Sequence, residues 1–286
     1  RQQRVRLGGA AEERHVDAAS EVLIDQVVKP YTDAYLIAKQ CTYESTENAG
    51  EVNGLLRWLN RIDNSDWLPS AMRFLADKGG DAAYVLWFVR RLERLASYMY
   101  LCGYDVNARI ERFAEVLKAL EVDHSMDSPV AAVELKSDEK ARFRQALDGA
   151  VYELPPKKRN YLILRLDSFV SDQAASYDST LLTIEHVLPQ TVAPGSQWEQ
   201  WWPDSAARQA WVHRLANLVP LNRHRNSAAQ NYDFDVKKDK YFKGKEKVSS
   251  YALTTQVLSG SVWTPDVVAE RQRMLLARLF AAWELG

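Results

Sequence analysis

The hydrophobic pattern over the first 173 residues predicts a succession of helices. Apolar residues recur there at spacings of three and four, which places them on one face of an α-helix. Pro30 should kink or break the first helix, whereas Pro155 and Pro156 suit a helix start, where a missing N–H costs nothing. No fixed-period repeat is found, which favours a helical bundle over a solenoid. The predicted helices cover residues 12–40, 48–63, 65–80, 81–103, 105–121, 137–154 and 155–173.

The pattern changes after about Asp178. Residues 179–189 and 216–222 read as short strands, and Pro189 should end the first of them. Between them, a loop and a short helix carry four of the nine tryptophans, which more often pack a small domain than stack on bases. A polar helix should begin at 223–231, followed by a solvated lysine-rich segment and a closing amphipathic helix over 264–286. The tryptophans are Trp198, Trp201, Trp202 and Trp211.

These patterns predict a mainly α protein with two parts, a helical domain over 1–150 and a second domain over 151–286. The 286-residue chain has globular composition, with 47% hydrophobic and 26% charged residues. The net charge of −1 gives no strong global field. From residue 151 onward, 17 Lys+Arg face 14 Asp+Glu, a net of +3, against −4 for the first part. The second part is therefore the better place to look for an anionic ligand.

The cysteine content and the lengths of the apolar runs also limit the expected compartment and the expected kind of metal site. The two cysteines, Cys41 and Cys102, lie far apart, which excludes a thiolate zinc site and fits a reducing cytoplasm. No apolar run approaches eighteen residues, so no membrane span is expected. The sequence begins without methionine, from which we expect a further domain upstream.

The candidate chemistry lies in the strand–loop–strand–helix segment 181–231. A carboxylate and an amide oxygen, those of Glu185 and Asn226, suit a hard cation such as Mg²⁺ or Mn²⁺. The neighbouring His186 imidazole could take a proton from water, and Asn217 could fix its tautomer through a hydrogen bond. Neighbours on a strand point to opposite faces, so Glu185 and His186 need a bend or bulge to serve one site. Together these residues predict metal-assisted phosphodiester hydrolysis.

The sequences "IEHVLPQ" and "ANLVPLNRHRNSAAQN", followed by "FDVKKDKY", resemble the His-Asn-His (HNH, or ββα-metal) nuclease motif. More narrowly, residues 154–241 are similar to the C-terminal nuclease domain of GmrSD-type and SspE-like modification-dependent restriction and phage-defence proteins. The chain departs from that pattern with Ala216 where glycine is usual and with Asn226 in place of the last histidine. The resemblance implies a small ββα-metal nuclease motif within the helical bundle, with DNA as substrate. It also implies a bacterial defence role and an upstream nucleotide-binding sensor domain, linked to the nuclease by the helical part.

The basic residues around this motif could contact the phosphate backbone without reading sequence. His213 is expected to be a structural, hydrogen-bonded packing residue. A zinc site built by His186, His213 and His224 is a lower-ranked alternative. The expected nucleic-acid-binding residues are Arg223, His224, Arg225, Lys237, Lys238 and Lys240.

Three interpretations of the activity stay open from the sequence. One site cuts one strand at a time, so we expect nicking, and a double-strand break would need a homo-oligomer or two successive cuts. The same chemistry would also serve RNA cleavage. A helical interaction and regulatory module with an inactive nuclease fold is the alternative of a different class, although packing alone does not require the set of Glu185, His186, Asn217 and Asn226.

Overall fold

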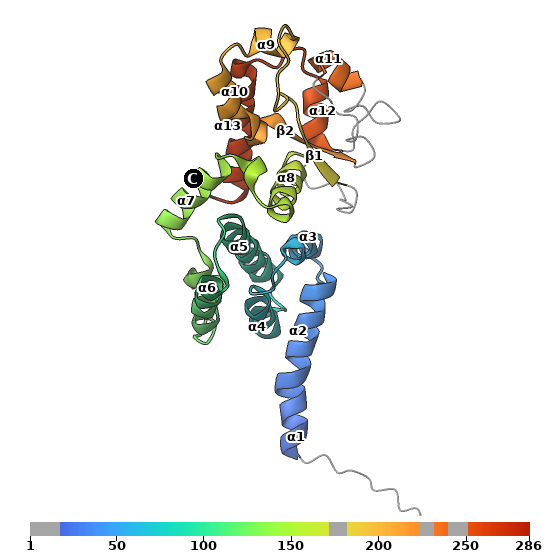
Figure 1. The fold of residues 1–286 in the computed structure, drawn as a ribbon. Helices are drawn as coiled ribbons and strands as arrows, with labels where there is room; N and C mark the ends of the chain where they lie inside the picture. Colours follow the sequence, from blue (N-terminus) through green and yellow to red (C-terminus); the bar gives the residue numbers. More distant parts are fainter. Residues whose placement is uncertain (1–17, 172–181, 223–231, 240–250) are drawn as a thin grey trace, which may run out of the picture.

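The computed structural model describes residues 18–171, 182–222, 232–239 and 251–286 (Figure 1). It is mainly helical, and one two-stranded sheet is found among the described residues, so the predicted fold class is confirmed. None of the described helices is long and apolar enough to cross a membrane. The division into domains at residue 150 stays a prediction.

The first three elements form one helical rod that projects from the body of the molecule (Figure 1). They are α1 (Ala18–Leu23), a π-helical turn η1 (Ile24–Val28) and α2 (Lys29–Gln40). The chain stays helical through Pro30, so the predicted break does not occur. Pro30 is the second residue of α2, two positions after the π-helical turn, and such a wider turn lets a helix continue where proline cannot donate its hydrogen bond.

The helical part follows the predicted order closely. Asp81 accepts a hydrogen bond from the Tyr84 N–H at the start of α5, and Asp105 does the same for the Ala108 N–H at the start of α6. The central helix α5 is buried along most of its length. The helices are α3 (Ala49–Arg61), α4 (Leu68–Lys78), α5 (Ala82–Leu101), α6 (Val106–Ala119), α7 (Ser137–Leu147) and α8 (Pro156–Val170).

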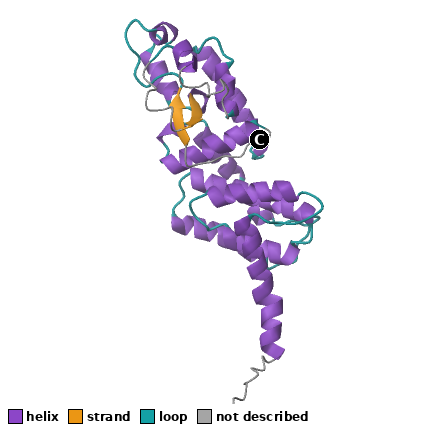
Figure 2. Cartoon of the chain, turned by 90° about the vertical axis from the view of Figure 1, so that its right-hand side faces the viewer, coloured by secondary structure: helices purple, strands orange, loops and turns teal. Residues whose placement is uncertain are grey.

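The sheet lies in the second part, surrounded by helices (Figure 2). Strands β1 (Leu182–His186) and β2 (Leu218–Asn222) pair antiparallel without interruption, from Leu182 opposite Asn222 to His186 opposite Leu218. Both strands contact α8, and β2 also contacts α12. The accompanying helices are α9 (Gln197–Trp201), α10 (Ser205–Val212), α11 (Phe234–Lys237), α12 (Ala252–Leu258) and α13 (Pro265–Ala282).

Two hydrophobic cores hold the molecule together. The larger runs from the helical part through α8 to one face of β1 and to α13. The smaller fills the other side of the sheet and includes the fully buried Trp198 and Trp202 with Trp263 and Phe234. The interpretation of the tryptophan cluster as packing is therefore confirmed for Trp198 and Trp202.

A buried carboxylate joins the helical part to the second part. Glu93 of α5 is 1% exposed and accepts hydrogen bonds at Oε1 from Arg165 Nε (2.9 Å) and Tyr161 Oη (3.2 Å) of α8. Its Oε2 accepts from the indole Nε1 of Trp283, at the end of α13, at 3.0 Å. Burial makes such an ion pair costly to break, because each charge then lacks its partner.

We expect Glu93→Ala to lower the free energy of unfolding by about 3–5 kcal/mol, because it leaves Arg165 buried without a counter-charge. The matched control is Glu51→Ala. The Glu51–Arg90 ion pair joins α3 to the same central helix, α5, but its side chains are 38% and 40% exposed, so about 1 kcal/mol or less should be lost. Urea unfolding followed by circular dichroism measures both, and equal losses would contradict the assignment.

Candidate active site

The end of β1 presents Glu185 and His186 on opposite faces of the strand. Leu182 and Ile184 are buried in the larger core, and His186 follows them in the alternation. Glu185 belongs to the other face, toward α11. Of the expected bend or bulge, no bulge is formed, because the pairing with β2 continues through His186, and the chain bends only after it, at Val187 and Leu188. The two side chains therefore have different surroundings.

His186 is 5% exposed and sits among aromatic and polar side chains. Its Nε2 lies 3.1 Å from Nδ1 of His213, and its Nδ1 lies 3.3 Å from Nε2 of Gln190. The Tyr152 ring packs against it with ring centroids 4.0 Å apart. Burial, reinforced by His213, Lys237 and Arg159, lowers the pKa of His186 to about 3. The imidazole is thus neutral at physiological pH, the form that can accept a proton.

Asn217 takes a different role from the one predicted. Its side chain is fully buried, and Oδ1 accepts from the Leu188 N–H (2.7 Å) while Nδ2 donates to the Leu188 carbonyl (3.0 Å). Nδ2 also donates to the Val212 carbonyl, and Oδ1 accepts from the Trp263 indole. These bonds replace the expected hydrogen bond to His186. Asn217 instead fixes the backbone directly after His186.

Ala216, which stands where the family pattern usually has glycine, does not adopt a backbone conformation that requires glycine. Ala216 lies in a 3₁₀ turn (Leu215–Asn217) and is not among the residues with positive φ. Its N–H donates to Gln272 Oε1 at 2.8 Å, and its carbonyl accepts from Arg271 Nε at 3.1 Å. Helix α13 therefore holds the turn that carries Asn217.

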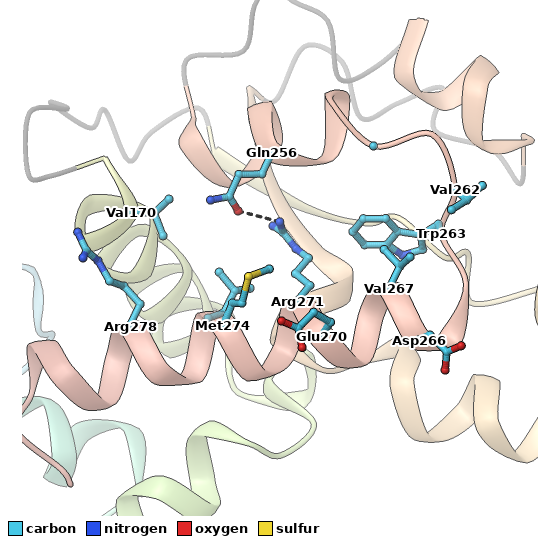
Figure 3. A pocket seen from close by; sticks show the side chains of 12 residues that line it. Val170, Gln256, Val262, Trp263, Asp266, Val267, Glu270, Arg271, Met274 and Arg278 are labelled. Atoms are coloured by element: carbon cyan, nitrogen blue, oxygen red, sulfur yellow. Dashed lines mark hydrogen bonds between the residues drawn. The ribbon is translucent and has the colours of Figure 1, made fainter.

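Arg271 also borders an apolar pocket of about 750 Å³, lined by α12, α13, the segment between them and the end of α8 (Figure 3). Figure 3 shows Arg271 bonded to Gln256, with Trp263 and Met274 nearby. Glu185 and His186 are not among its lining residues. Arg271 and Trp263, which line the pocket, bind the Ala216 carbonyl and the Asn217 side chain. The pocket itself is separate from Glu185 and His186.

Lys237 is buried against the end of β1. Its side chain is 1% exposed, and Nζ donates to the carbonyls of His186 (2.8 Å) and Val187 (3.2 Å) and lies 3.4 Å from Glu185 Oε1. Burial raises the pKa of Glu185 and lowers that of Lys237, and their mutual attraction opposes both shifts. The expectation of a solvated lysine segment is wrong at this position, because the ammonium group faces the interior and cannot reach a phosphate at the surface.

The sequence did contain a sign of this burial. Phe234 and Lys237 are three residues apart in α11, so they lie on the same face of the helix. Phe234 is fully buried in the smaller core, and Lys237 follows it inward. The role of Tyr152 had no comparable sign, because it depends on contacts between distant segments. Gln190, by contrast, is four residues from His186 and belongs to the motif "IEHVLPQ".

The remaining predicted residues divide into two groups. Lys238 donates to the Gly260 carbonyl at 2.8 Å and pairs with Asp235 at 2.9 Å. The others lie outside the described residues, so their metal-binding and phosphate-binding roles stay predictions. These are Arg223, His224, Arg225, Asn226 and Lys240.

Of the described residues at the candidate site, Glu185 offers carboxylate oxygens that a metal ion could use. Among the described residues, no three His, Cys, Asp or Glu side chains come together as ligands. Mg²⁺ and Mn²⁺ keep several waters and need few protein oxygens. The Glu185 carboxylate, with its side chain 13% exposed, fits one such ligand position.

Residues 137–278 match the family model described as the C-terminal domain of GmrSD restriction endonucleases. No curated protein and no solved structure matches the chain. The match covers both strands, the Asn217 turn and most of α13.

We expect Lys237→Met to lower the free energy of unfolding by about 3 kcal/mol or more, because it leaves Glu185 without its partner and two carbonyls unbonded. Lys238→Met, at the residue that follows α11, is the matched control. Its partner Asp235 is 71% exposed, so about 1 kcal/mol should be lost. Denaturant unfolding measures the free energy of unfolding of both variants. A larger loss for Lys238→Met than for Lys237→Met would contradict the buried role of Lys237.

Stability should also depend on pH through His186. Its folded-state pKa of about 3 lies below the unfolded value of 6.5, so only the unfolded chain binds this proton between those values. Stability is therefore complete above pH 6.5 and falls as pH drops toward 3, by up to about 1.4 kcal/mol per pH unit. Unfolding free energies measured against pH in EDTA should fall less steeply for His186→Gln. Parallel curves would contradict the assignment.

Proposed function

Since residues 137–278 belong to the C-terminal domain family of the GmrSD restriction endonucleases, we propose that the chain is a metal-dependent endonuclease of the HNH type that nicks DNA. The observation that carries the proposal is His186, a buried neutral imidazole one residue from the Glu185 carboxylate at the end of β1. The family supports a nuclease of bacterial defence. The identity of the base and the metal ligands is our inference.

His186 is the general base in this proposal. Gln190 Nε2, an amide nitrogen, can only donate, so His186 Nδ1 accepts its hydrogen bond and carries the lone pair. An attacking water would take the place of Gln190 at Nδ1 and give its proton to that nitrogen. Asn217 keeps Leu188 fixed, which sets the position of the loop that carries Gln190.

Glu185 and Asn226 would hold one Mg²⁺ or Mn²⁺. The ion would stabilise the charge that develops on the phosphate and on the leaving oxygen. Glu185 and His186 leave the strand on opposite faces, so the phosphodiester must lie across the end of β1 to reach both. Lys237 holds the Glu185 carboxylate and the carbonyls of His186 and Val187, which keeps this end of the strand rigid.

The nucleic acid would approach over the segments that follow β2 and α11. Lys238, Arg223, His224, Arg225 and Lys240 are the proposed phosphate contacts, and binding through them would weaken as salt rises. Lys237 is not included, because it is buried. An upstream sensor domain, acting through the helical part, remains the partner that the family resemblance suggests.

The test is conversion of supercoiled plasmid to open circles with Mg²⁺ or Mn²⁺, compared with EDTA. Wild-type chain should nick only with metal, and His186→Ala should lose about 10²- to 10⁴-fold in rate, the contribution of a general base. His124→Gln, which changes a buried histidine of the helical part, should retain activity.

Metal-dependent nicking that persists in His186→Ala would show that the base has been misassigned. Absence of cleavage by the wild-type chain on both DNA and a single-stranded RNA would overturn the nuclease proposal and favour a regulatory module. Cleavage of the RNA alone would identify a ribonuclease.

A further inference from the structure

A second histidine lies in direct contact with the proposed base. His213 follows the last residue of α10, 27 residues beyond His186 in the chain, and the two rings meet at 5.2 Å between centroids and 66° between planes. The closest atoms are His186 Nε2 and His213 Nδ1, 3.1 Å apart. That distance is a hydrogen bond, so one imidazole donates and the other accepts.

The direction of this hydrogen bond follows from the bond that the other ring nitrogen of His186, Nδ1, makes with Gln190. Because Gln190 Nε2 donates to His186 Nδ1, the imidazole proton must be on Nε2. His186 therefore donates from Nε2 to His213 Nδ1, and His213 carries its own proton on Nε2. The three side chains form one chain of hydrogen bonds with a single direction, from Gln190 through His186 to His213.

His213 is itself held in place. Its carbonyl accepts from the Tyr152 N–H at 3.0 Å. The Tyr152 ring stacks on the His213 ring at 5.4 Å and 12°, and contacts His186 at 4.0 Å. The Arg159 guanidinium lies over the Tyr152 ring, 4.1 Å from its centroid, and donates a hydrogen bond to the Tyr152 carbonyl at 2.8 Å. The acceptor nitrogen of His213 thus has a fixed position relative to His186.

We propose that His213 is a positioning residue for the nuclease reaction, which holds His186 in the tautomer that leaves the Nδ1 lone pair available to water. This rests on the proposed function of His186. His213 touches neither water nor phosphate in this role.

The first test reads the tautomer directly and does not depend on cleavage. Long-range ¹H–¹⁵N correlation spectra of the histidine rings, recorded near pH 7 on the full chain, should show the His186 proton on Nε2. In His213→Phe the acceptor is lost, and a fraction of His186 should carry its proton on Nδ1. A His186 proton on Nδ1 in the wild-type chain would overturn the proposal, whether or not His213→Phe folds.

The second test uses rescue by a conservative variant in the plasmid-nicking assay. His213→Phe should slow nicking by about 10- to 100-fold, the usual effect of removing a partner that orients a reactive group. His213→Asn should restore most of the rate, because the asparagine oxygen can stand where Nδ1 stood and accept the same bond. Equal rates for the two variants, with both shown to be folded by circular dichroism, would overturn the positioning role.

The two tests separate the failure of this proposal from that of the nuclease assignment. If the wild-type chain does not cleave nucleic acid but the spectra show the expected tautomer and its loss in His213→Phe, only the nuclease assignment fails. If the chain nicks and His186→Ala does not, while His213→Phe nicks at the wild-type rate, the positioning role fails alone.

Discussion

The buried amide of Asn217 is the contact on which the arrangement of the candidate site depends. It pairs with both backbone polar groups of Leu188, as a neighbouring strand would, and it joins that segment to Val212 and Trp263. An amide is suited to this because it donates and accepts side by side. The chain directly after His186 would otherwise leave buried N–H and carbonyl groups unpaired, at a cost of about 1–3 kcal/mol each.

Burial then sets the electrostatics of the neighbouring groups. The same enclosure that keeps His186 neutral also raises the pKa of Glu185 and draws the Lys237 ammonium inward as its partner. A charged group in this environment needs compensation from close range, and Lys237 provides it to a carboxylate and two carbonyls at once. The acid and the base at the end of β1 are thus separated into one ion-paired and one neutral environment, although they are adjacent in sequence.

Buried hydrogen bonds and ring contacts also join the two parts of the chain. Glu93 lies on the central helix of the helical part, and its partners come from α8 and from Trp283. Closer to the site, Tyr152 connects the segment between α7 and α8 to both histidines. Because Tyr152 also packs against the larger core, the proposed base is connected through this ring to the core that both parts share.

The helices, the two strands and the family resemblance could be predicted from the sequence, because these depend on local periodicity, caps and a motif with fixed spacing. Asp81 and Asp105 cap the helices that they were predicted to start, and β1 ends before Pro189. The partners of the site residues could not be predicted in the same way. Asn217 was expected to hold the imidazole but holds Leu188 instead, and Lys237 was expected at the surface but is buried. Which donor meets which acceptor is a property of the tertiary fold, because a hydrogen bond between distant segments is set by how their helices and strands pack. Local sequence indicates at most which face of a helix turns inward, as for Phe234 and Lys237.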